Sequence, residues 1–493
     1  MSEMELTADV LVVGAGPTGL LLAGDLATAG LRVTVLEKRA AESNLTRAFA
    51  VHARTLEQLD ARGLADELIA TGRPLGSLRL FGRLRIELGN LPTRFPFVLI
   101  TPQSNTERLL QERALKAGAV LVRGAEVTGL RQDAEGVSLT VREGGSTVVH
   151  RARYAVGADG VHSSVRDLLG IPFPGESVVN SVMLADVRVD REPDEAVTVG
   201  ATEAGFAFMA PFGDGWYRVI AWDRERQRPD SDPVDMVELA ELARTVFGED
   251  FGLRDARWTS RFHSDERQVP TYRSGRVFLA GDAAHCHSPA GGQGMNTGLQ
   301  DAANLGWKLA AAVRGWAPDA LLDTYQTERH PVGRAVLRSS GALVRVALAQ
   351  NTPARALRSA VSTVAEHLGP VAALGAKQVS GIGISYPAQK GSHPLVGRRL
   401  PDLRLAVDAP GDPSRLYEAL RAGKAVLISN DELSVADSWA DRVVTAAPAD
   451  PHGKLRDTVL LVRPDGYAAW AGVDPTRGEL RTALGQWLGR PAD

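Results

Sequence analysis

The residues best suited to chemistry lie between positions 281 and 301, GDAAHCHSPAGGQGMNTGLQD. Packing alone does not require glycine at this density, whereas a backbone that must approach a flat, phosphate-bearing ligand does. Asp282 follows a predicted strand over residues 276–280 and can accept hydrogen bonds from ligand hydroxyls at the strand end. The stretch therefore predicts a ligand-binding loop, with Pro289 and Gly292 among its contacts.

A helix is predicted to follow this loop, beginning at Asn296 or Thr297 and ending near Arg314. The backbone N–H groups of a first helical turn have no partner inside the helix, so they point at whatever the loop holds. The positive end of the helix dipole lies at the same place and favours an anionic ligand. We therefore expect Gly294, Met295 and Asn296 to donate backbone hydrogen bonds to the ligand.

A second phosphate-binding signature, G-x-G-x-x-G, occupies residues 14–19. Its glycines allow a tight turn, close approach of the backbone to a pyrophosphate, and packing of the next helix on the strand. A β-branched run at 9–13 precedes it, and a helix over 17–29 and a strand over 32–36 follow. The strand ends at an acid placed to accept ribose hydroxyls. This order predicts a Rossmann-like dinucleotide site formed by Gly14, Gly16, Pro17, Thr18, Gly19, Glu37 and Lys38.

A single ligand that reaches both glycine-rich stretches must be long, which favours a dinucleotide such as FAD. The G-x-G-x-x-G motif alone does not separate FAD from NAD, and the simpler alternative is a strand–helix turn followed by a surface glutamate. Glu37, in a place where arginine would suit a ribose 2′-phosphate, argues against such a phosphate. An NAD-linked dehydrogenase is the weaker alternative, because it does not explain the second glycine-rich stretch.

A third polar stretch follows the strand predicted over residues 152–157. Asp159 and Gly160 end this strand, and Ser164 and Arg166 lie on a new helix. Ligands of open α/β sheets bind at the carboxyl edge of the strands, which makes Asp159 a candidate contact. Taken alone, an Asp-Gly pair indicates only a turn.

Residues 178–261 have a different pattern, with short apolar strands separated by turns. The pattern predicts an antiparallel sheet inserted between parts of the first domain, with strands over 181–189, 196–200, 206–211 and 216–222. Its aromatic residues could line an apolar pocket, and core packing is the alternative. These residues are Phe206, Phe208, Phe212, Trp216, Tyr217 and Trp222.

Composition limits the class of protein. A chain of 493 residues is long enough for two or three domains, and its net charge of -3 argues against nucleic-acid or anionic-membrane partners. The apolar run at residues 20–23 is too short to span a membrane. The single cysteine, Cys286, excludes an internal disulfide and fits a reducing cytoplasm. Its neighbours His285 and His287 are adjacent in a loop and rarely converge on one ion, so no metal site is expected.

The three polar stretches, in this order, resemble the motifs of the class A flavoprotein monooxygenases, which include para-hydroxybenzoate hydroxylase. Residues 14–19 resemble the ADP-binding motif, residues 157–160 the DG motif and residues 281–296 the GD motif. The resemblance implies FAD as cofactor, NADPH or NADH as co-substrate, and O₂ as oxidant. It also implies that Arg47 and Gln103 contact FAD.

More narrowly, the chain resembles the actinobacterial aromatic polyketide hydroxylases, which carry a thioredoxin-like C-terminal extension. The predicted fold class is therefore α/β (α+β overall). Without a cysteine the extension has no redox role here, and it is expected to be structural or to contact the second subunit of a homodimer. Its predicted strands span 424–430, 459–463 and 465–471. The predicted division is an FAD-binding domain (1–75, 101–177, 276–345), an antiparallel-sheet substrate domain (76–100, 178–275), a helical linker (346–392) and a thioredoxin-like domain (393–493).

The resemblance implies hydroxylation of a polycyclic aromatic substrate through a flavin C4a-hydroperoxide. Because the cofactor carries the difficult step, no protein nucleophile is expected, and no catalytic residue is assigned. The alternatives are a Baeyer–Villiger oxygenation, an oxygen-independent flavin reductase, and a protein that sequesters or inactivates an antibiotic. Candidate contacts to the substrate are His52, Arg54, Phe206, Phe208, Trp216 and Tyr217.

Overall fold

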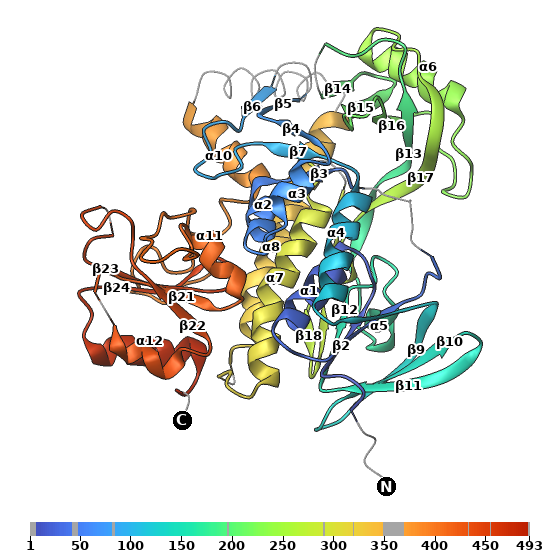
Figure 1. The fold of residues 1–493 in the computed structure, drawn as a ribbon. Helices are drawn as coiled ribbons and strands as arrows, with labels where there is room; N and C mark the ends of the chain where they lie inside the picture. The colour runs from blue at the N-terminus through green and yellow to red at the C-terminus, as the bar shows by residue number, and fades with distance from the viewer. Residues whose placement is uncertain are drawn as a thin grey trace.

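The structure, a computed structural model, is a mixed helix-and-sheet fold (Figure 1). It describes residues 6–41, 48–80, 84–194, 197–288, 291–318, 320–348, 369–431, 433–453 and 455–491. None of the helices in these ranges is long and apolar enough to cross a membrane.

A six-stranded sheet forms the core of the nucleotide-binding fold, in the order β18-β19-β12-β1-β2-β8. All neighbours are parallel except β18 and β19. Helix α1 (Pro17–Thr28) contacts both α4 (Gln103–Lys116) and α7 (Gly294–Val313). The strands are β1 (Val10–Val13), β2 (Val33–Glu37), β8 (Val120–Arg123), β12 (Tyr154–Gly157), β18 (Arg273–Ser274) and β19 (Val277–Leu279).

Smaller elements complete this half of the molecule. The antiparallel sheet β11-β10-β9 contacts β1 and β2. It consists of β9 (Ala125–Gln132), β10 (Val137–Glu143) and β11 (Ser146–Ala152). The other elements are β3 (Ala50–Val51), β4 (Arg73–Leu75), β5 (Ser77–Leu80), β6 (Leu84–Glu87), β7 (Val98–Ile100), α2 (Ala53–Asp60), α3 (Ala65–Ile69), α5 (Ser164–Leu168), α8 (Thr324–Leu348) and α10 (Gly369–Ser380).

The inserted antiparallel sheet is confirmed, with the strand order β14-β15-β16-β13-β17-β20. Apolar residues alternate along its strands, so one face packs on α6 (Met236–Phe247) and the other faces the nucleotide-binding fold. The last strand, β20 (His285–Cys286), belongs to the glycine-rich stretch and joins that stretch to this sheet. The other strands are β13 (Gly175–Arg188), β14 (Thr198–Ala201), β15 (Gly205–Pro211), β16 (Tyr217–Asp223) and β17 (Arg254–Gln268).

The C-terminal sheet has the order β22-β21-β23-β24, a parallel pair followed by an antiparallel hairpin. With the following helix α12 (Arg477–Leu488) it agrees with the predicted thioredoxin-like fold. The strands are β21 (Ala425–Ile428), β22 (Val443–Ala446), β23 (Thr458–Val462) and β24 (Ala468–Val473), and the short helix α11 (Leu416–Ala419) precedes them. Strand β24 begins three residues later than predicted, because Gly466 at φ +79° forms a turn there.

One helix boundary and one helix differ from the prediction. Helix α7 begins at Gly294, because the Asn296 side chain does not cap it but donates to the carbonyls of Ala50 and Gly292. Helix α6 was not predicted, although Asp235 caps its start and Gly248, with φ +79°, ends it.

A buried ion network joins the C-terminal sheet to α7 and α8. Arg463 Nη1 lies 2.6 Å from Glu328 Oε1, and Arg463 Nε donates to Asp465 at 2.9 Å. Lys308 Nζ lies 2.8 Å from Glu328 Oε2. Burial raises the pKa of Glu328, but Arg463 and Lys308 outweigh it and leave the pKa well below its usual range. Burial lowers the pKa of Lys308 to about 8 although Glu328 opposes this.

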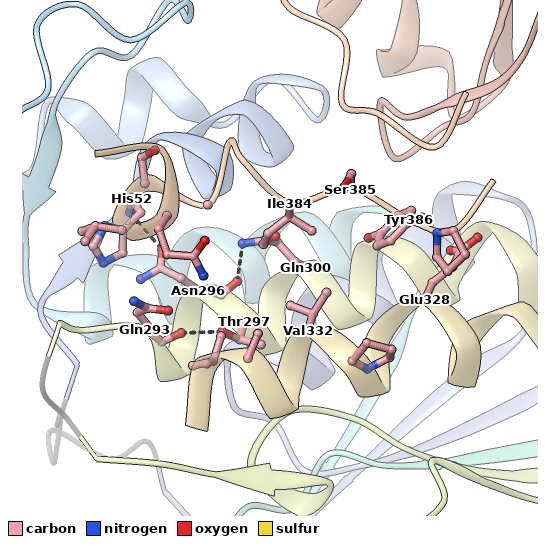
Figure 2. Close-up of a pocket in the computed structure, with 18 residues that line it drawn as sticks. His52, Gln293, Asn296, Thr297, Gln300, Glu328, Val332, Ile384, Ser385 and Tyr386 are labelled. Carbon is pink, nitrogen blue, oxygen red and sulfur yellow. Dashed lines mark hydrogen bonds between the residues drawn. The ribbon is translucent and has the colours of Figure 1, made fainter. Parts of the chain in front are cut away.

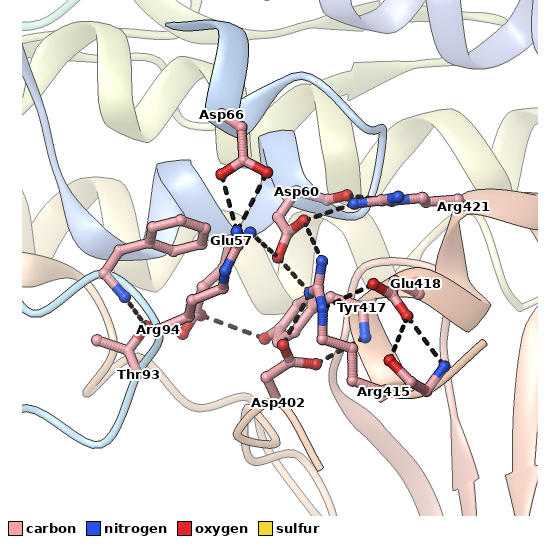
Figure 3. Close-up of polar contacts among 12 residues, drawn as sticks. Glu57, Asp60, Asp66, Thr93, Arg94, Asp402, Arg415, Tyr417, Glu418 and Arg421 are labelled. Atoms are coloured by element: carbon pink, nitrogen blue, oxygen red, sulfur yellow. Dashed lines mark hydrogen bonds and ion pairs between the residues drawn. The ribbon is translucent and has the colours of Figure 1, made fainter. Parts of the chain in front are cut away.

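A second group of contacts joins the C-terminal domain, in the segment before its sheet, to α2 (Figure 3). Asp60, at the end of α2, binds Arg415 Nη2 at 2.9 Å and Arg421 Nη2 at 3.0 Å. Glu57, one helical turn earlier, accepts from Arg399 Nε at 2.8 Å. Together the two groups fix the C-terminal domain against α2, α7 and α8.

We predict that Arg463→Gln lowers the free energy of unfolding by about 3 kcal/mol, because it removes one partner of a buried ion network. Arg456→Gln is the control, since Arg456 pairs with Asp457 on the surface and its loss should change stability by less than about 1 kcal/mol. Urea denaturation measures both values. Equal effects of the two substitutions would contradict the structural importance of the network.

Candidate active site

A cavity of about 620 Å³ lies at the carboxyl edge of the parallel sheet, where it meets the antiparallel sheet. It brings together residues of all three polar stretches, which are far apart in the sequence. The predicted contacts that line it are Gly14, Gly16, Pro17, Thr18, Glu37, Lys38, Gln103, Asp159, Asp282, Gly292, Gly294 and Met295. We call it the large cavity.

The turn between β1 and α1 depends on its glycines. Gly14 has φ +103°, and a Cβ atom there would lie 2.3 Å from the Ala158 carbonyl oxygen. A Cβ atom on Gly19 would lie 2.0 Å from the Gly14 carbonyl oxygen, so Gly19 serves the turn and not the cavity. At Gly16 there is open space, and among the described residues no side chain caps the first turn of α1. The free N–H groups of this turn suit a phosphate.

The Glu37 carboxylate at the end of β2 is held in place by hydrogen bonds. One carboxylate oxygen accepts from the Ala15 backbone N–H at 2.8 Å, and the other accepts from Arg39 Nε at 2.9 Å. Burial raises the pKa of Glu37, but the hydrogen bonds from Arg39 and Ala15 leave it below its usual value. The first oxygen also accepts from Arg39 Nη2 at 3.3 Å, and the second also accepts from the Arg39 backbone N–H at 2.9 Å.

Asp159 lines the large cavity and also accepts hydrogen bonds from its neighbours in the sequence. It accepts from the hydroxyls of Ser163 at 2.5 Å and Ser164 at 3.1 Å, and from the Val165 backbone N–H at 3.2 Å. These bonds fix the start of α5. Arg166, on that helix, lies 4.1 Å from the ring centre of Phe173.

His287 was not predicted as a contact to the bound ligand, because its position in the sequence was interpreted only in terms of metal binding. Its Nδ1 lies 2.9 Å from the Ser288 carbonyl oxygen, so Nδ1 carries the proton and Nε2 has a lone pair. Nε2 is buried without a hydrogen-bond partner among the described residues. A Cβ atom on Gly294 would lie 3.7 Å from it and 4.0 Å from Asp282 Oδ1, so the three residues converge on the large cavity.

His285 has a different role. Its Nε2 lies 2.6 Å from Asp301 Oδ2 in the middle of α7, and Asp301 also accepts from the Gly281 backbone N–H and from Arg329 Nε. Burial raises the pKa of Asp301, but Arg329 and His285 leave it below its usual value. Cys286 is half-buried and lines the large cavity. In the described ranges no three His, Cys, Asp or Glu side chains are placed to hold a metal ion.

Of the six candidate substrate contacts, His52 lines a second cavity described below, and the other five line neither cavity. Phe208 lies 5.1 Å from the ring of Phe49, which lines the large cavity, and Phe206 stacks on Trp222 on the same face of the sheet. Trp216 lies against Arg257, with 4.6 Å from the guanidinium to the ring centre. Sequence reasoning missed the apolar residues of this sheet that do line the large cavity, because they look like ordinary strand core; they are Leu184, Ile220 and Phe262, and the polar residues His263, Ser264 and Asp265 of β17 lie beside them.

Two of these substrate candidates, Tyr217 and Arg54, point away from the large cavity. Tyr217 lies on the opposite face of the sheet and packs against α6, because it alternates with the residues that face the cavity. Arg54 is completely buried and donates to Glu57 at 2.9 Å and to the Tyr417 hydroxyl at 2.8 Å. Its partner Tyr417 lies in the C-terminal domain, so the spacing around Arg54 could not reveal this contact.

A second cavity, of about 390 Å³, lies between α7, α8, α10 and residues 384–387 (Figure 2). His52 lines it; its backbone N–H donates to Asn296 Oδ1 at 2.9 Å, and its Nε2 donates to the Gly291 carbonyl at 3.0 Å. Burial lowers the pKa of His52 to about 4, so the ring is neutral. Asn296 lines this cavity and not the large one. Arg47 and Pro289 lie outside the described residues.

Known proteins share both halves of this arrangement. The sequence matches the family described as FAD binding domain over residues 7–340 and the aromatic-ring hydroxylase C-terminal domain over residues 393–491. The rifampicin monooxygenase of Streptomyces venezuelae is 40% identical over 489 residues, 98% of each chain. OxyS, the anhydrotetracycline hydroxylase from Streptomyces rimosus, is 38% identical, with a TM-score of 0.87 over 98% of this chain and 100% of that chain. The dialkyldecalin synthase of Streptomyces rugosporus is 36% identical over 98% of this chain and 99% of its own.

The fold and the cavity therefore define a flavin-dependent enzyme of the aromatic hydroxylase class. The chain belongs to the family of class A FAD-dependent aromatic hydroxylases, and the family resemblance of its three motifs is confirmed.

We predict that Gly19→Ala lowers the free energy of unfolding by about 3 kcal/mol, because the new methyl group would overlap the Gly14 carbonyl. Gly485→Ala is the matched control: Gly485 lies in α12 with open space around its Cα, and alanine there should stabilise the helix by about 0.5–1 kcal/mol. Urea denaturation compares the two. An unchanged midpoint for Gly19→Ala would contradict the close turn.

Proposed function

We propose that the protein is an FAD-dependent monooxygenase that uses NADPH or NADH and O₂ to hydroxylate a polycyclic aromatic substrate of the polyketide type. The observation that carries this proposal is that one cavity joins both glycine-rich stretches to an apolar wall of the substrate sheet. Relatives named for rifampicin and anhydrotetracycline support the substrate class. A homodimer and a cytoplasmic location remain part of the proposal.

The residues of the large cavity fit FAD. The uncapped first turn of α1 would hold the pyrophosphate, and Glu37 would accept from the ribose of the adenosine. Asp282 and the unpartnered Nε2 of His287 would bind the ribityl chain. The N-terminus of α7, which no side chain caps, would face the pyrimidine ring. When bound, the flavin supplies the redox chemistry with NAD(P)H and O₂.

The protein contributes orientation and exclusion of water. Leu184, Ile220 and Phe262 would place an aromatic ring beside the flavin and keep the site apolar. No described residue is assigned as a catalytic base. We retain the proposed division into an FAD-binding domain (1–75, 101–177, 276–345), a substrate domain (76–100, 178–275), a linker (346–392) and a C-terminal domain (393–493).

The proposal predicts that purified protein retains FAD and that NADPH or NADH is consumed together with O₂ when the correct polycyclic phenol is added. With ¹⁸O₂ the product should contain one labelled oxygen atom, which mass spectrometry detects. A hydroxylated ring and an ester from Baeyer–Villiger oxygenation have the same mass, so NMR must separate them. Protein that stays colourless after incubation with FAD would reject every flavin-based function, including this one.

A flavoprotein reaction without oxygen transfer is the second candidate, favoured by the 36% identity to dialkyldecalin synthase. This candidate predicts substrate turnover without net NAD(P)H or O₂ consumption. An oxygen electrode run with the true substrate distinguishes the two functions.

We also predict that Asp282→Ala raises the dissociation constant of FAD about tenfold, because a hydrogen bond from a ribityl hydroxyl to a charged acceptor is lost. Asp431→Ala is the control, since Asp431 is exposed in the C-terminal domain. Quenching of flavin fluorescence measures both constants. An Asp282→Ala protein that binds FAD as tightly as the wild type would remove Asp282 from the proposed site.

A further inference from the structure

The second cavity is not explained by FAD binding, since its lining is largely different from that of the large cavity. The two share Gln293, and the first turn of α7 with the loop before it separates them. Gly292 and Gly294 have no side chains, so this partition is thin where they lie. A ligand in the second cavity would therefore lie close to a flavin on the other side.

The walls of the second cavity suit a flat, largely apolar group. Val332 and Val336 come from α8, and Ile384 comes from the segment after α10 (Figure 2). A volume of about 390 Å³ lies in the range of small-molecule sites. These side chains would contact the faces and edges of an aromatic ring.

One polar group on this wall needs a partner. Gln300 is 5% exposed, and its Nε2 donates to the Asn296 carbonyl at 3.1 Å. Its Oε1 is buried and accepts no hydrogen bond from any described residue. A buried acceptor left without a donor costs stability, so a ligand that brings an O–H or N–H group would relieve that cost.

The charges around the cavity favour a neutral ligand. Glu328 is the only charged side chain among its described lining residues, and Arg463 and Lys308 already neutralise it. His52 is neutral because burial lowers its pKa to about 4. With no lysine or arginine on the described lining, a phosphate or carboxylate would find no counter-charge there.

We propose that the second cavity binds a hydroxyl-bearing aromatic ring of the polycyclic substrate, distinct from the ring placed beside the flavin, with Gln300 Oε1 accepting the hydrogen bond of that hydroxyl. The inference rests on the proposed function and deepens it, since it assigns a specificity-determining residue. Through this hydrogen bond, Gln300 would select phenolic rings over apolar rings of the same shape.

The test compares 2-naphthol with 2-methylnaphthalene, two probes of similar shape of which only the first has a donor. Isothermal titration calorimetry measures their binding to the FAD-loaded protein. The wild type should bind 2-naphthol more tightly, and Gln300→Met should weaken 2-naphthol about 5- to 10-fold while leaving 2-methylnaphthalene nearly unchanged. Ala335→Phe, which fills the cavity from α8, should weaken both probes.

Three results would overturn the inference: equal binding of the two probes to the wild type, an unchanged preference in Gln300→Met, or unchanged binding of both probes in Ala335→Phe. The wild-type comparison needs no variant, so a variant that fails to fold does not decide the outcome. Flavin absorbance of the same samples separates a failure of the proposed function from a failure of the role of Gln300. A wild type without bound FAD contradicts the proposed function, whereas FAD-loaded protein without discrimination contradicts only the role of Gln300.

Discussion

The hydrogen bonds of the buried Asp301 carboxylate are the interaction on which the rest of the structure depends. Asp301 lies in the middle of α7 and accepts from Gly281, His285 and Arg329 at 3.1, 2.6 and 2.6 Å. These bonds tie the strand end that carries Asp282 to α7 and α8. The position of the helix N-terminus relative to this strand end is thereby fixed, and both cavities are built around that N-terminus.

Helix α7 connects the site to the C-terminal domain. Asn296 holds the loop before α7, while Lys308, three turns further on, binds Glu328 and so meets Arg463 of the C-terminal sheet. The cost of removing charges from water offsets much of the attraction in a buried ion network, whereas losing one partner of such a network is strongly destabilising. We therefore interpret the cysteine-free C-terminal domain as a brace for α2, α7 and α8, and residues of α7 and α8 also line the second cavity.

Prediction from the sequence was most accurate at positions where the backbone conformation itself is constrained. Gly14 and Gly19 could be assigned from their spacing because no other residue fits the turn between β1 and α1. Arg54 could not be placed, because its partners come from a domain more than 350 residues further along the chain. Tyr217 was misplaced since the alternation along β16, and not residue type, decides which face it occupies. The second cavity was missed because α7, α8, α10 and the segment at residues 384–387 each contribute only a few ordinary residues to it.

A crystal structure of the protein with FAD tests the central claim most directly. The account predicts the pyrophosphate against the first turn of α1 and the pyrimidine ring against the backbone N–H groups of Gly294 and Met295, with His287 Nε2 facing the ribityl chain. The flavin ring would then lie within the large cavity, and the second cavity would remain available to the substrate. A flavin ring bound in the second cavity, or an FAD that contacts only one of the two glycine-rich stretches, would contradict it.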